Sequence, residues 1–122
     1  MLLVAGIPVH AALRIEHWYK LEYAYVSRVK TALAQLAKPD DMVLVSSHEA
    51  PEILYYLDRY GYAVEPKAWT PEMASGYIHH GVRFILLPLE DNRASLPQWT
   101  AYLKTRARLV SQDPDYLLYR QG

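Results

Sequence analysis

The stretch from Met42 to Val64 constrains the fold most, because it holds a strand, a loop, a helix and a second strand in one short unit. The apolar run Met42–Val45 is too short for a helix and suits a strand that is covered on both faces. Pro51 lies where a helix can begin without losing a needed N–H donor, and Gly61 is expected to end that helix. A second strand is expected at Tyr62–Glu65. The stretch therefore predicts a parallel βαβ unit.

The rest of the chain continues to alternate between helices and strands. Apolar residues at spacings of three and four predict helices, and continuous or alternating apolar runs predict strands. Thr70 is expected to cap a helix that closes at Gly81, and Ser95-Leu-Pro-Gln98 matches a capping box at the start of another. The expected helices cover 18–37, 51–60, 71–80 and a segment from 96 onwards. The expected strands cover 42–46, 62–65, 82–88, 107–111 and 115–120, the last two joined by a turn of four or five residues.

This order predicts an α/β fold: a three-layer αβα sandwich with a mostly parallel, Rossmann-like sheet and a C-terminal β-hairpin. At 122 residues the chain has room for one domain. We expect that domain at 18–122, after an apolar N-terminal segment at 1–17.

A candidate site follows from this topology. Right-handed crossovers place the second and third strands on opposite sides of the first. The crevice at the carboxyl ends of the first and third strands is where such folds usually bind ligands. Two loops supply its candidate ligand or acceptor residues: Ser46, Ser47, His48, Glu49, Glu90, Asp91, Asn92 and Arg93. His48 and Arg93 are expected to approach each other there.

The motifs around the histidines do not predict a metal site. The segment from His48 to Glu52 lacks the second histidine of a zinc-protease helix. His48 and Glu52 could bind a metal or an anionic headgroup at the helix start, but local neutralisation of the helix end is the favoured interpretation. His79 and His80 are adjacent on a helix, point about 100° apart and chelate poorly. We therefore expect no metal.

Composition and loop chemistry limit the function further. The chain has no cysteine, which excludes disulfides and thiolate zinc sites. The first strand is not followed by a glycine-rich phosphate loop, so no nucleotide cofactor is expected, and no nucleophile motif predicts a catalytic residue. Positive and negative side chains balance at 13 each, so no nucleic-acid partner is expected.

The N-terminal segment has two interpretations. Residues 1–15 are apolar up to Arg14 but fall short of the ~20 residues that cross a bilayer. They form either a buried strand or helix, or the end of a transmembrane helix. Aromatic residues that follow favour a membrane interface, although an ordinary amphipathic helix with aromatic core contacts remains the alternative. The interface residues would be Trp18, Tyr19, Tyr23 and Tyr25.

Three segments of the chain, 43–62, 81–87 and 115–120, carry a family resemblance. They resemble the C-terminal soluble domain of bacterial polytopic membrane glycosyltransferases, which are related to protein mannosyltransferases and lipid A aminoarabinose transferases. The resemblance covers about residues 15–120 and implies an αβα domain on the extracytoplasmic face of the membrane, periplasmic or extracellular.

The resemblance implies an accessory role. In that family the catalytic carboxylates lie after the first membrane helix and the polyprenyl-phosphate sugar binds among the membrane helices, so no catalytic residue carries over to this chain. The implied partners are the membrane region of the parent transferase or lipid headgroups, and possibly the molecule that accepts the sugar. The alternative is a free-standing, cytoplasmic αβα module that binds a ligand or a protein.

Overall fold

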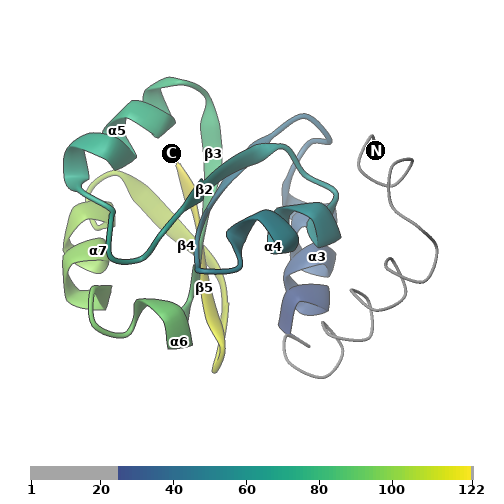
Figure 1. Cartoon of the computed structure of the whole chain (residues 1–122). Helices are drawn as coiled ribbons and strands as arrows, with labels where there is room; N and C mark the ends of the chain where they lie inside the picture. Colours follow the sequence, from purple (N-terminus) through teal and green to yellow (C-terminus); the bar gives the residue numbers. More distant parts are fainter. Residues whose placement is uncertain (1–24, 122) are drawn as a thin grey trace.

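The computed structural model describes residues 25–121 and shows an α/β domain built on a five-stranded mixed sheet (Figure 1). The strand order is β2-β1-β3-β5-β4, with β1 parallel to both β2 and β3, and β5 antiparallel to β3 and β4. The strands are β1 (Met42–Ser46), β2 (Gly61–Val64), β3 (Val82–Pro88), β4 (Ala107–Asp113) and β5 (Tyr116–Gln121). The helices are α3 (Tyr25–Leu36), α4 (Ala50–Leu57), α5 (Pro71–His79), α6 (Leu89–Asn92) and α7 (Leu96–Leu103).

Helices bury both faces of the central strands. Figure 1 shows α3 and α4 on one side of the sheet and α5 and α7 on the other. The first core gathers side chains such as Val29 and Ile53 against Phe84, and the second gathers Trp99 and Leu103 against Ile85. Strands β1 and β3 contribute to both cores, which explains their continuous apolar sequences. The predicted α/β alternation, the order of the first three strands and the C-terminal hairpin are confirmed. Because two of the four strand pairings are antiparallel, the described sheet is mixed.

Gly61 does not end helix α4, so that prediction is wrong. The helix stops at Leu57, and Asp58 takes the left-handed conformation (φ 57°) with its N–H directed to the carbonyls of Leu54 and Tyr55. Gly61 instead starts β2 beside β1. A Cβ atom on Gly61 would lie 1.8 Å from the carbonyl oxygen of Val43, so only glycine allows this approach.

The predicted capping signals of α5 and α7 have different outcomes. Thr70 caps α5 as predicted, its side chain accepting a hydrogen bond from the Met73 N–H at 3.1 Å, and Gly81 follows that helix with φ 105°. The capping box at Ser95 is not formed. Ser95 Oγ lies 3.5 Å from the Asn92 carbonyl oxygen, because the short helix α6 occupies the expected loop and turns this hydroxyl back towards it.

The hairpin turn is tighter than predicted. Asp113 pairs directly with Tyr116, which leaves only Pro114 and Asp115 in the loop. The Asp113 carboxylate accepts a hydrogen bond from the Asp115 N–H at 2.8 Å. Arg28 on α3 donates to the carboxylate of Asp113 at 2.6 Å and to that of Asp115 at 2.7 Å. The hydrogen bond to Asp113 is the main cause that raises the pKa of Arg28.

The predicted membrane-interface residues Trp18, Tyr19 and Tyr23 lie outside the described residues, as does the apolar segment 1–17. Tyr25 is 8% exposed and stacks on Tyr116 with ring centroids 6.2 Å apart, so its ring belongs to the first core. None of the helices within 25–121 is long and apolar enough to cross a membrane.

Candidate functional site

A buried hydrogen-bond network joins the carboxyl ends of β1 and β3. Ser46 Oγ donates to Asn92 Oδ1 at 2.6 Å, while Asn92 Nδ2 donates to the carbonyl oxygens of Ser46 at 2.7 Å and Pro88 at 2.8 Å. Ser46 and Asn92 are both fully buried. Their polar atoms satisfy one another, as buried polar groups must. These two predicted crevice residues therefore hold α6 against β1, and their side chains are closed off from solvent.

Ser47 organises the turn between β1 and α4. Its hydroxyl donates to the carboxylate of Asp91 and accepts the backbone N–H of Glu49 at 3.0 Å. Ser47 is 2% exposed, whereas Asp91 is half-buried and reaches the surface. The hydrogen bond from Ser47 fixes one carboxylate oxygen of Asp91, so the orientation of this acid is set by the β1 loop.

No hydrogen bond or ion pair joins His48 to Arg93. His48 is exposed, and its Nδ1 lies 2.6 Å from Glu65 Oε2, just beyond the end of β2. Arg93, which follows the last residue of α6, is exposed, and its side chain makes no hydrogen bond or ion pair with any of residues 25–121. Glu49 and Glu90 lie outside the lining of the pocket that opens beside these loops.

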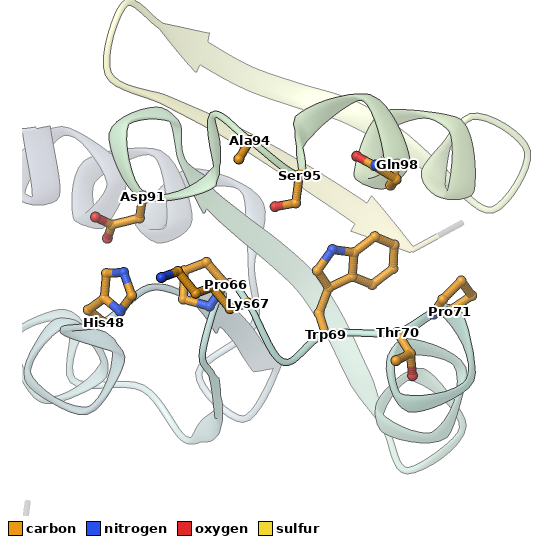
Figure 2. Close-up of a pocket in the computed structure, with 10 residues that line it drawn as sticks. All are labelled: His48, Pro66, Lys67, Trp69, Thr70, Pro71, Asp91, Ala94, Ser95 and Gln98. Atoms are coloured by element: carbon orange, nitrogen blue, oxygen red, sulfur yellow. The ribbon is translucent and has the colours of Figure 1, made fainter.

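A pocket of about 670 Å³ opens beside these loops, on the α5 and α7 side of the sheet. Figure 2 shows two facing walls, one from the α6–α7 segment and one from the β1 and β2 loops. Of the eight residues predicted for the crevice, His48 and Asp91 line this pocket. Its lining consists of His48, Pro66, Lys67, Trp69, Thr70, Pro71, Asp91, Ala94, Ser95 and Gln98.

Trp69 gives the pocket a rigid aromatic wall. Its indole stacks on that of the fully buried Trp99, with ring centroids 4.1 Å apart and planes inclined by 15°. The Tyr102 ring meets Trp69 edge-on at 6.1 Å, and its hydroxyl is hydrogen-bonded to Ser75 at 2.6 Å. Trp69 itself is half-buried, so the surface of its indole that these neighbours leave free faces the pocket.

The sequence prediction missed most of this lining. Topology pointed to the loops after β1 and β3, but the loop after β2 and the start of α7 supply the larger share of the pocket. The available signal was the proline-flanked stretch Pro66–Pro71 around Trp69. Each proline restricts the backbone at its own position, and tryptophan combines a large apolar ring with a polar N–H. The stretch therefore indicates a restrained loop that carries an aromatic side chain.

The polar groups of the two loops pair with one another. The hydroxyl of Ser47 donates a hydrogen bond to the carboxylate of Asp91, whereas the imidazole of His48 contacts the carboxylate of Glu65. Within residues 25–121 no three acidic or histidine side chains come together as metal ligands. The pocket instead offers a carboxylate, an ammonium, an amide and a hydroxyl around an indole, from Asp91, Lys67, Gln98, Ser95 and Trp69.

Comparison of the whole chain with protein-family models, with curated protein sequences and with solved structures gives no match.

Proposed function

We propose that this chain is an accessory, non-catalytic domain of a membrane glycosyltransferase that uses polyprenyl-phosphate-linked sugar. In this proposal the fold is a three-layer αβα sandwich whose parallel part is Rossmann-like, held on the extracytoplasmic face of the membrane against the transferase or lipid headgroups. The resemblance supports the proposal because its segments 43–62, 81–87 and 115–120 fall on four adjacent strands of the sheet, β2, β1, β3 and β5, and on helix α4.

The pocket is the observation that carries this function. A pyranose ring has apolar faces of C–H groups and a rim of hydroxyls, so it is best complemented by an aromatic surface flanked by planar hydrogen-bonding groups. The rigid indole of Trp69 and the side chains of Asp91 and Gln98 supply that combination. We assign the pocket to the sugar of an acceptor.

A free-standing binding module is the second candidate function. The observation that favours it is the closure of both hydrophobic cores within residues 25–121, since the described helices cover the central strands without help from another chain. The two candidates share the pocket and differ in the partner that the domain serves.

Titration of the chain with neutral di- and trisaccharides, followed by ligand-observed NMR, tests the assignment. We expect saccharide signals to be perturbed by the chain and this effect to be lost in Trp69→Ala and reduced in Gln98→Ala. Gln98 is exposed, so its replacement leaves the fold intact. The matched control is Tyr60→Ala, which removes an aromatic ring that is 77% exposed at the opposite end of β2. Equal loss in the control, or no saccharide effect at all, would refute the assignment.

A further inference from the structure

A second hollow, of about 520 Å³, lies at the opposite end of the sheet, where β3 and β4 begin and β5 ends. We call it the basic hollow. Five of the 13 lysines and arginines of the chain line it: Arg83, Lys104, Arg106, Arg108 and Arg120. Its other lining residues carry no charge.

The fold gathers these cations from distant parts of the sequence. Antiparallel pairing sets Arg108 of β4 directly opposite Arg120 of β5. Arg120 in turn pairs with Phe84, which brings the neighbouring Arg83 to the same end of the sheet. Lys104 follows the last residue of α7. The neutral overall charge of the chain conceals this concentration.

The cations of the basic hollow are not neutralised within the described part of the chain. The ion pairs formed among residues 25–121 join Arg28 to two aspartates and His48 to Glu65, so they lie elsewhere. Arg106 is held by neutral groups: its guanidinium lies 4.3 Å from the centre of the Tyr102 ring and donates to the Tyr102 carbonyl oxygen at 2.9 Å. Like charges directly opposite each other on paired strands are destabilising, so Arg108 and Arg120 raise the free energy of the fold.

We infer that the basic hollow binds a multiply charged oxyanion of the phosphate class. Arg108 and Arg120, which lie directly opposite each other, carry guanidinium groups, and the planar donor pattern of a guanidinium matches the oxygens of phosphate. A bound anion would also relieve the repulsion between Arg108 and Arg120. A free oligophosphate and a phosphorylated lipid headgroup present the same chemistry. The site is separate from the saccharide pocket and does not depend on the function proposed for it.

Isothermal calorimetry of the full chain with inorganic pyrophosphate at low salt tests the inference directly. We expect Arg108→Gln and Arg120→Gln each to weaken binding by about tenfold, because each removes charge-assisted hydrogen bonds. The matched control is Arg93→Gln, which removes the same charge from an exposed arginine outside the hollow and should change affinity less than about twofold. The melting temperature of Arg108→Gln should equal or exceed that of the wild type, because the opposed charge is gone.

Sedimentation with phosphatidylglycerol vesicles, against phosphatidylcholine vesicles, identifies the source of the phosphate. The inference is supported if the chain binds pyrophosphate or anionic vesicles, if Arg108→Gln loses this binding and if Arg93→Gln keeps it. Binding of neither probe overturns it, as does equal weakening by Arg93→Gln. A preference of more than about tenfold for a short DNA duplex over both probes would also overturn it, in favour of a nucleic-acid surface.

Discussion

At the residue scale, Gly61 and Gly76 have opposite structural requirements. A Cβ on Gly61 would collide with the backbone of β1, whereas a Cβ on Gly76, inside helix α5, would meet nothing within 4 Å. The collision at Gly61 involves a backbone carbonyl, which cannot rotate away as a flexible side chain can. Relief therefore requires β1 and β2 to separate.

Replacement of each glycine by alanine should consequently shift stability in opposite directions. Gly61→Ala should lower the free energy of unfolding by about 2–4 kcal/mol, because strand pairing is lost. Gly76→Ala should raise it by about 0.5–1 kcal/mol, because alanine is the better helix former. Urea denaturation of the two variants measures both effects, and a loss of similar size at both positions would show that the close approach at Gly61 is not the cause.

At the scale of elements, the network of Ser46 and Asn92 decides how α6 sits against β1. Topology alone placed both residues in a ligand crevice, since it fixes where loops end but not which side chains turn inwards. A serine and an asparagine after buried strands serve equally well as ligand contacts or as internal bonds. The choice depends on the burial of α6 itself, which no local pattern encodes.

Asn92→Ala should lower the free energy of unfolding by about 2–4 kcal/mol, because it leaves buried partners of three hydrogen bonds unsatisfied. His48→Ala and Arg93→Ala should each cost no more than about 0.5–1 kcal/mol, since both side chains are exposed. Leu86→Ala in the core of β3 sets the upper reference, at about 2–5 kcal/mol. Thermal denaturation of the four variants side by side provides the comparison. If Asn92→Ala behaves like the two exposed variants, the network does not hold α6.

At the scale of the whole molecule, the sequence predicted the order of the elements except for the short helix α6, and it predicted that the strand order reverses between β1 and β3. Buried strands and amphipathic helices leave strong local signals. The sequence predicted less of the pocket. The walls from Trp69 and Gln98 belong to segments whose approach depends on how α7 packs on the sheet, through the stacking of Trp69 on Trp99. The hairpin length was also missed, because Asp113 joins the strand ladder while its side chain stabilises the turn.

The accessory role predicts that the isolated chain transfers no sugar. The reason is that the glycosyltransferase resemblance carries no catalytic residue over to this chain. Incubation of the chain with polyprenyl-phosphate sugars and simple saccharide acceptors should yield no product above a heat-inactivated sample. Turnover that exceeds this background would mean that the domain catalyses the reaction itself.

We assign the function of this domain to the pocket around Trp69. A two-dimensional amide NMR titration of the full chain with the same neutral saccharides tests this assignment residue by residue. We expect the shifted signals to cluster at the indole N–H of Trp69, the side-chain amide of Gln98 and the backbone of Asp91, with the buried strand β3 unchanged. Shifts confined to residues outside the pocket, or a spectrum that does not change at saturating saccharide, would contradict the assignment.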